Sequence, residues 1–155
     1  MPKLPLVIEV IKTAATEPST WHYTITFPGE NWINPTFDVT SWPSGNSGFG
    51  TAGTPNATVG TKWSTSDIWL AREVQLTQAD LQSNLHWMEH HDEDTEIFIN
   101  GQMAAKFTGY SVNYELKALS ETARSLFKSG LNRITIHCHQ TGGGMPGCWT
   151  YSPTG

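Results

Sequence analysis

Charged residues, cysteines and long hydrophobic runs are all scarce in this chain. Asp, Glu, Lys and Arg together make up 15% of its 155 residues, and the formal net charge is −5. A mildly acidic chain lacks the positive surface that nucleic acids and anionic membranes attract. No apolar run reaches the length that a membrane-spanning helix needs. We therefore expect neither nucleic acid nor membrane as a partner.

The two cysteines, Cys138 and Cys148, are too few for the disulfide framework of a small secreted domain. Two interpretations stay open. A single bridge would close a short loop between them, or Cys138 is simply a small buried apolar residue. The apolar segment 4–11 is short and contains Pro5, so it predicts a strand and not a signal peptide.

Aromatic residues and alternating patterns are abundant instead. The chain holds seven Trp, six Phe and four Tyr. Trp21, Tyr23, Ile25 and Phe27 alternate with polar residues, which predicts a half-buried strand. Similar patterns predict further strands at 68–76, 85–91, 97–99, 103–107, 112–116 and 132–139. Only a capped turn near 77–80 and a short helix at 120–128 interrupt them. The sequence therefore predicts an all-β, antiparallel β-sandwich in a single domain, residues 1–155.

Residues 90–101 combine two histidines, a group of acids, a short apolar run and a turn dipeptide. The acids Asp92, Glu93 and Asp94 are costly to bury unpaired, so they predict an exposed bend. Residues 97–99 predict a core strand, and Asn100-Gly101 is a strong hairpin signal. The segment 30–62 that precedes these strands is irregular but rich in aromatics, which is typical of a functional loop or a cover over the core.

The order of several short motifs resembles a known family. These motifs are Trp32…Phe37-Asp38…Trp42, Thr65-Ser66-Asp67-Ile68-Trp69-Leu70, Ile97-Phe98-Ile99-Asn100-Gly101, Gly109-Tyr110 and Gly130-Leu131-Asn132. Together they resemble the galactose-binding-like jelly roll, in particular the sugar-binding domain of family 2 glycoside hydrolases and related carbohydrate-binding accessory modules. The resemblance runs from about residue 21 to residue 144. It implies a jelly roll within a larger secreted or periplasmic polysaccharide hydrolase, with a catalytic domain of the same parent chain as partner.

The resemblance also implies where a sugar binds. The bend at 91–94 and the segment 140–151 approach the sugar in that family, and the ligand-binding candidates there are Asp92, Glu93, Asp94, Gln140, Trp149 and Tyr151. Three tryptophans in loops, Trp32, Trp42 and Trp63, are further candidates because flat rings pack against sugar C–H faces. The sequence departs from the family at residues 145–155, an atypical tail that lacks the pattern of a final strand.

The acidic bend has three interpretations: a solvated turn, hydrogen bonds to sugar hydroxyls, or a structural calcium near Asp92 and Asp94. The histidines His90, His91, His137 and His139 raise the alternative of a transition-metal site in a small metal-dependent enzyme. His137 and His139 share one face of a predicted strand, whereas Ile134, Ile136 and Cys138 share the other.

A glycosidase needs two carboxylates that face each other across the scissile bond. Asp92, Glu93 and Asp94 are adjacent in one segment, so a second acid such as Glu30, Asp38 or Asp67 would be required. We therefore expect the domain to be non-catalytic. With the loop aromatics, the resemblance implies a carbohydrate-binding module that requires no cofactor. A β-sandwich that only braces a catalytic domain is the second alternative beside the metal-dependent enzyme.

Overall fold

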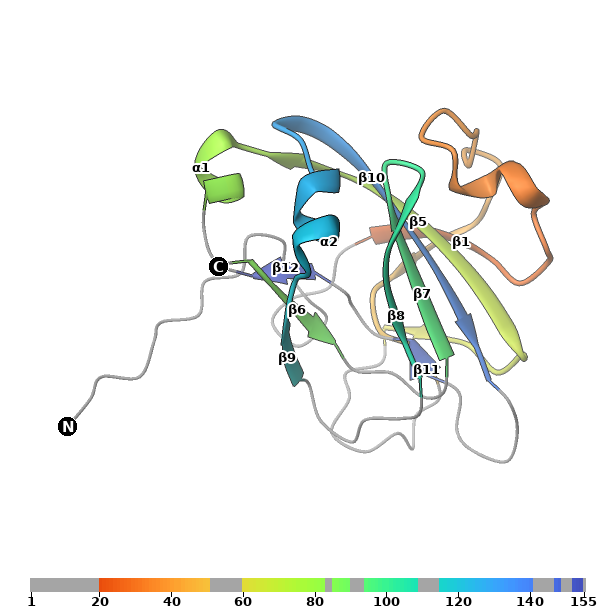
Figure 1. Cartoon of the computed structure of the whole chain (residues 1–155). Coiled ribbons are helices and arrows are strands. Elements are labelled where there is room, and N and C mark those ends of the chain that lie inside the picture. Colours follow the sequence, from red (N-terminus) through yellow and green to blue (C-terminus); the bar gives the residue numbers. More distant parts are fainter. Residues whose placement is uncertain are drawn as a thin grey trace.

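The computed structural model of the chain describes residues 20–50, 60–82, 85–89, 94–108, 115–140, 147–148 and 152–154, and Figure 1 shows their arrangement. The elements are β1 (Thr20–Thr24), η1 (Glu30–Ile33), β2 (Ser44–Asn46), β3 (Phe49–Gly50), β4 (Thr61–Lys62), β5 (Asp67–Leu76), α1 (Gln78–Gln82), β6 (His86–Glu89), β7 (Asp94–Ile99), β8 (Gln102–Phe107), β9 (Glu115–Ala118), α2 (Glu121–Leu126), β10 (Gly130–His139), β11 (Gly147–Cys148) and β12 (Ser152–Thr154). No helix among the described residues is long and apolar enough to cross a membrane.

The strands form one large sheet and two small ones. The large sheet has six strands in the order β2-β1-β5-β10-β7-β8, and all of its neighbours are antiparallel. The small sheets have the orders β12-β6-β9 and β11-β3-β4. Side chains from all three sheets, among them Ile136, Trp87 and Phe49, meet in one core. The predicted all-β sandwich is confirmed, with two short helices at its margin (Figure 1).

The long strand β10 separates the core from the outer face of the large sheet. Ile134, Ile136 and Cys138 point into the core and are at most 1% exposed. This confirms the predicted division of the strand, because alternate residues of a strand face opposite sides. Yet Thr135, on the outer face, is also buried at 1% exposure. The outer face is therefore partly covered.

The cover is the segment 25–43, which we call the cover segment. Its Trp32 meets Phe98 of β7 edge-on, with ring centroids 5.6 Å apart. Arg133 of β10 donates a hydrogen bond from Nη1 to the Phe37 carbonyl at 3.0 Å. The aromatic residues of the cover segment thus pack it onto the sheet. For the part up to residue 43, this is the covering role that was one of the two predicted for residues 30–62.

A tight hairpin joins β7 to β8 where the sequence reads Asn100-Gly101. Both residues have positive φ, +50° and +90°, as a two-residue hairpin turn demands. The Asn100 side chain donates to the Leu126 carbonyl and to Asn132 Oδ1, and it accepts from the Arg133 amide. The predicted turn is confirmed, and its side chain also ties the hairpin to the end of α2 and to β10.

Two predictions about strand boundaries are wrong. The strand predicted over 21–27 ends at Thr24, and Ile25 and Phe27 are 52% and 61% exposed. The Thr26 amide bonds to Thr24 Oγ1 at 3.2 Å, which turns the chain away from the sheet. At the other end, residues 145–155 do carry strand pairing, because β11 pairs with β3 and β12 pairs with β6. The strand predicted at 4–11 lies outside the described residues.

Smaller features complete the fold. Thr77 and Asp80 exchange two hydrogen bonds, of 2.8 and 3.1 Å, and so form the predicted capped turn at the start of α1. Cys138 is disulfide-bonded. Of the two interpretations of Cys138, the simple buried thiol is therefore wrong.

Candidate ligand-binding surface

Two rows of side chains cross the outer face of the large sheet at one end. In the first row Asp67 of β5 and Asp94 of β7 flank His139 of β10. In the second row Trp69 and Glu96 flank His137 in the same order of strands. Directly paired residues in an antiparallel ladder point to the same side, so the register alone gathers these polar groups into one surface.

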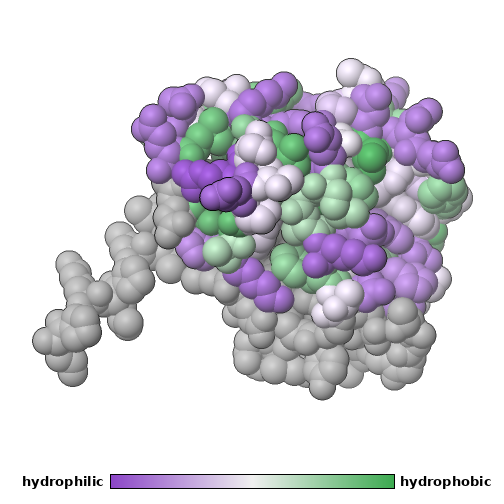
Figure 2. Space-filling model, viewed as in Figure 1, coloured by the Kyte–Doolittle hydropathy of each residue, from purple (hydrophilic) through white to green (hydrophobic). Residues whose placement is uncertain are grey.

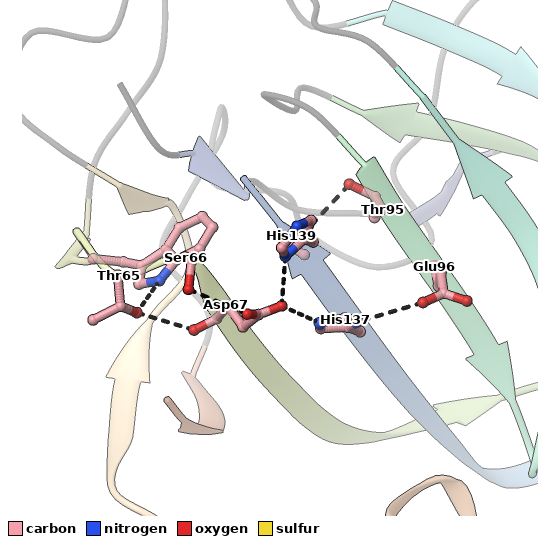
Figure 3. Close-up of polar contacts among 9 residues, drawn as sticks. Thr65, Ser66, Asp67, Thr95, Glu96, His137 and His139 are labelled. Carbon is pink, nitrogen blue, oxygen red and sulfur yellow. Dashed lines mark hydrogen bonds and ion pairs between the residues drawn. The ribbon is translucent and has the colours of Figure 1, made fainter. Parts of the chain in front are cut away.

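Four of these residues, Asp67, Glu96, His137 and His139, form a connected group that we call the histidine–carboxylate network (Figure 3). Asp67 Oδ1 lies 2.8 Å from His137 Nε2 and 2.8 Å from His139 Nδ1. His137 Nδ1 lies 3.1 Å from Glu96 Oε1. Because a carboxylate only accepts, both contacts of His137 are hydrogen bonds at once only when both of its ring nitrogens carry protons.

Asp67 is the centre of the network, and hydrogen bonds from the residues just before it in the chain hold it in place. Ser66 donates to its Oδ2 at 3.2 Å, Thr65 Oγ1 donates to its carbonyl at 3.0 Å, and Trp63 Nε1 donates to Thr65 Oγ1 at 2.7 Å (Figure 3). Partial burial raises the pKa of the Asp67 carboxyl. Hydrogen bonds from His137 and His139 and their charges outweigh that effect, so the pKa is lowered from 3.8. Asp67 is thus an ionised acceptor at neutral pH.

Aromatic rings border the network on one side. The His137 ring stacks on Trp69, with centroids 4.9 Å apart and planes 5° from parallel. Phe27 of the cover segment tilts against the other ring of this pair, Trp69, at 5.9 Å. Trp69 is buried, but Phe27 is 61% exposed. The surface therefore presents the exposed Phe27 ring beside polar side chains. Among these, the His139 side chain is 42% exposed.

The structure brings two of the predicted ligand residues to this surface. Asp94 is half-buried and pairs with His139 across the strands. Gln140 follows directly after β10, and its backbone N–H donates to the Ser66 carbonyl at 2.8 Å. Four other candidates, Asp92, Glu93, Trp149 and Tyr151, lie outside the described residues.

The predicted loop tryptophans do not join this surface. Trp32 and Trp63 are 7% and 2% exposed, so neither offers a ring face to solvent. Trp63 belongs to the core, and Trp32 packs on Phe98 beneath the cover segment. Trp42 is half-buried and meets Phe37 at 6.0 Å within the cover segment. Sequence pattern places these residues in loops, but burial follows from what the loops pack against.

Within the described part of the chain, no three His, Cys, Asp or Glu side chains are arranged to hold a metal ion. His137 and His139 share a face, as predicted, but their ring contacts go to carboxylates. His90 and His91 lie outside the described residues. The structural calcium near Asp92 and Asp94 stays a prediction, since Asp92 also lies outside them.

Sequence reasoning missed the roles of Phe27 and Glu96 and treated Asp67 only as a spare acid. Phe27 fitted the alternation of a buried strand, and only the following Pro28-Gly29 hinted that the chain leaves the sheet there. Glu96 and Asp67 become neighbours of His137 because β10 lies between β5 and β7. That strand order is a long-range property that local patterns do not carry.

No protein-family model and no curated protein sequence matches the chain. Solved structures do match. A beta-glycosidase from Bacteroides vulgatus matches 97% of this chain with 20% of its own, at a TM-score of 0.59 and 13% identity. A beta-glucuronidase from Lactobacillus rhamnosus matches 90% of this chain with 22% of its own, at a TM-score of 0.57 and 15% identity. A glycosyl hydrolase family 2 member from Bacteroides cellulosilyticus matches 87% of this chain with 19% of its own, at a TM-score of 0.59 and 12% identity.

The chain spans about a fifth of the length of these glycosidases. Likeness at this level of identity is a likeness of fold, which is the fold that the motif order implied. The chain therefore has the β-sandwich fold of a domain that family 2 and related glycosidases carry as one part of a much longer protein.

Proposed function

We propose that the chain is a non-catalytic carbohydrate-binding domain that assists the catalytic domain of a larger glycoside hydrolase. One observation carries the proposal. An exposed aromatic ring, Phe27, lies beside the histidine–carboxylate network at one end of the large sheet. The fold supports it, because similar domains occur within glycosidases.

The surface suits the chemistry of a sugar. An aromatic ring packs against the C–H face of a pyranose, and planar polar side chains bond its hydroxyls. Phe27 supplies the ring. His139 uses Nδ1 for Asp67, and Glu96 uses Oε1 for His137. Among the described residues this leaves two atoms for sugar hydroxyls. His139 Nε2 can donate or accept, and Glu96 Oε2 can accept.

The same geometry supports a binding role over a catalytic one. A glycosidase needs a carboxylic acid whose pKa is raised, so that it can protonate the leaving group. The pKa of Asp67 is instead lowered by its two histidine partners. Asp67 and Glu96 also flank a single imidazole ring, whose nitrogens already occupy one oxygen of each. The catalytic carboxylates therefore belong to another domain in this proposal.

A secreted or periplasmic location is part of the proposal. A disulfide at Cys138 supports it, because disulfides persist in oxidising compartments. A calcium ion held by Asp92 and Asp94 is also proposed, and calcium titration of the folded protein followed by calorimetry tests it directly.

The alternative of a bracing domain would favour a continuous apolar patch for the neighbouring domain. The face shown in Figure 2 is mainly hydrophilic, and its hydrophobic areas are interrupted by polar residues. Among the described residues the large exposed hydrophobics are Ile25, Phe27, Met103 and Leu131. Two of these four belong to the segment beside the network, where a ring serves sugar binding equally well.

Affinity electrophoresis through gels that contain soluble polysaccharides tests the proposed function. We expect at least one glycan to retard the protein, and Phe27→Ala to weaken binding about threefold to tenfold. Phe27→Tyr should retain most of the affinity because it keeps the ring. Leu131→Ala is the matched control, since Leu131 is a similarly exposed hydrophobic at the far end of β10. A folded protein that no glycan retards would contradict the proposal and favour the bracing role.

A further inference from the structure

A concave feature lies on the outer face of the large sheet, away from the histidine–carboxylate network. It is a cleft of about 510 Å³ between the cover segment and strands β1, β5 and β10. Its lining includes His22, Phe37, Asp38, Thr40, Glu73 and Arg133, and no network residue borders it. Its volume falls within the range of roughly 300 to 1,000 Å³ that small-molecule sites occupy.

The cleft gathers buried nitrogen atoms that lack a partner. Within the described part of the chain, four buried side-chain atoms make no hydrogen bond, and His22 Nδ1 and Arg133 Nε are two of them. Both residues line the cleft, and the Arg133 side chain is only 10% exposed. A third such atom belongs to Arg72, which also borders the cleft but lies over the Trp21 ring, 5.9 Å from its centroid. Buried polar groups are normally satisfied. These nitrogens are enclosed by protein, so a ligand in the cleft bonds them only when their side chains turn toward it.

The wall of the cleft is already in place. The Thr40 amide and hydroxyl both donate to Asp38 Oδ1, at 2.9 and 2.6 Å. The Phe37 amide bonds the Asn34 carbonyl, and the Phe37 carbonyl accepts from Arg133. Val39 is buried beneath this turn. A wall that is ordered before binding loses little conformational entropy when a ligand enters.

The charges of the cleft select the chemical class of the ligand. Arg133 already pairs with Glu73 at 2.9 Å, so its charge is largely offset. Asp38 adds a second carboxylate, whose pKa is lowered by its hydrogen bonds from Thr40. Only Oδ1 of Asp38 is used by these bonds, which leaves Oδ2 as an acceptor. An anionic ligand would meet two carboxylates, whereas hydroxyl groups can both donate to Asp38 and accept from Arg133.

We propose that this cleft is a second sugar site, which binds one neutral mono- or disaccharide unit. The proposal rests on the proposed function for the chemical class of its ligand, but it concerns other residues. The network surface is open at the end of the sheet, whereas the cleft lies beneath the cover segment. The domain would thus contact a glycan at two separate places.

The test is a titration of the full chain with neutral mono- and disaccharides, followed by amide chemical shifts in NMR and by calorimetry. Each neutral sugar is compared with the uronic acid of the same ring. We expect at least one neutral sugar to shift the amides of Thr36, Phe37 and Thr40 and to bind better than its uronic acid. Asp38→Asn replaces a charged acceptor oxygen by an amide donor, and His22→Ala removes the imidazole, so each should weaken that binding about tenfold. Glu121→Gln, an exposed acid on α2, is the matched control.

His139→Ala separates the two sites. It should leave the binding of the small sugar unchanged while it weakens retardation by polysaccharide. The inference is overturned if no sugar shifts the cleft amides, if a uronic acid binds better than its neutral counterpart, or if the cleft variants bind normally. Polysaccharide retardation that persists in such a case would uphold the proposed function alone. Loss of both readouts in a folded protein would reject both.

Discussion

The His137 imidazole lies flat on the Trp69 indole, with planes only 5° from parallel. The two residues are direct cross-strand partners, so the stack joins β5 to β10 on the outer face of the sheet. Stacking fixes the plane of the imidazole, and its two nitrogens then meet Asp67 and Glu96 at opposite edges. Trp69 thus orients the His137 ring of the histidine–carboxylate network without being exposed itself.

The network should make stability depend on acid pH. The folded-state pKa of Asp67 is lowered below 3.8, so its contribution to stability is present above that value and is lost as pH falls through the folded pKa. We expect the unfolding temperature to drop between about pH 5 and about pH 2. Asp67→Asn, which keeps the acceptor oxygen but not the charge, should flatten this drop. A variant as acid-sensitive as the wild type would assign the effect to other carboxylates.

Asn132 should be among the costliest polar residues to replace. It is fully buried and makes four hydrogen bonds, to Lys128 O, Lys128 N, Gly130 O and Asn100 Nδ2. Asn132→Ala removes the side-chain partner of the Lys128 amide, the Lys128 carbonyl and the Gly130 carbonyl, and one of the two acceptors of Asn100 Nδ2. We therefore expect a loss of about 2–4 kcal/mol in the free energy of unfolding. Denaturant unfolding measures the loss. Asn31→Ala, at an exposed site in η1, should change stability by less than about 0.5 kcal/mol.

Two glycines with nearly equal φ separate backbone strain from steric contact. Gly101 has φ +90°, and an added Cβ would lie 3.1 Å from Pro35 Cδ of the cover segment. Gly29 has φ +95° and nothing within 4 Å of an added Cβ. Both Ala variants lose about 1 kcal/mol to strain at positive φ. Gly101→Ala should lose more, because the rigid proline ring cannot rotate away. If thermal unfolding shows equal losses of stability for the two variants, Pro35 moves aside without an energetic penalty.

Reduction of the disulfide at Cys138 should destabilise the domain by about 2–4 kcal/mol, because the unfolded chain regains conformational freedom. Denaturant curves with and without a thiol reductant measure the difference. A thiol assay should find no free thiol in the native protein and two after reduction, since the chain has two cysteines. Free thiols in native protein purified without reductant would contradict the bonded state.

Local patterns predicted the elements of this fold well where one strand carries its own signal. The alternation of β10 separated Ile136 from His137 correctly, and Asn100-Gly101 marked the turn between β7 and β8. The end of β1 was predicted too late, because Ile25 and Phe27 continue the alternation after the sheet pairing has stopped. Strand pairing, and not hydrophobicity, decides that boundary.

The candidate site was predictable only in part. Asp94 and Gln140 followed from the family resemblance, and both lie at the network end of the sheet. Trp32 and Trp63 were expected as loop platforms but are buried, since the loops that carry them fold back onto the sheet and into the core. The partners of His137 depend on β10 lying between β5 and β7. Asp67 and His137 are 70 residues apart in the sequence, so local patterns cannot show that they meet.

The short strand β12 has a practical consequence for anyone who shortens this chain. Ser152–Thr154 shield one side of β6, whose other side is paired with β9. A truncation before Ser152 would expose the backbone of His86–Met88 as a bare edge, with amides and carbonyls open to any extended peptide. Such a shortened protein should be prone to self-association through that edge, even though every side chain of the histidine–carboxylate network would still be present.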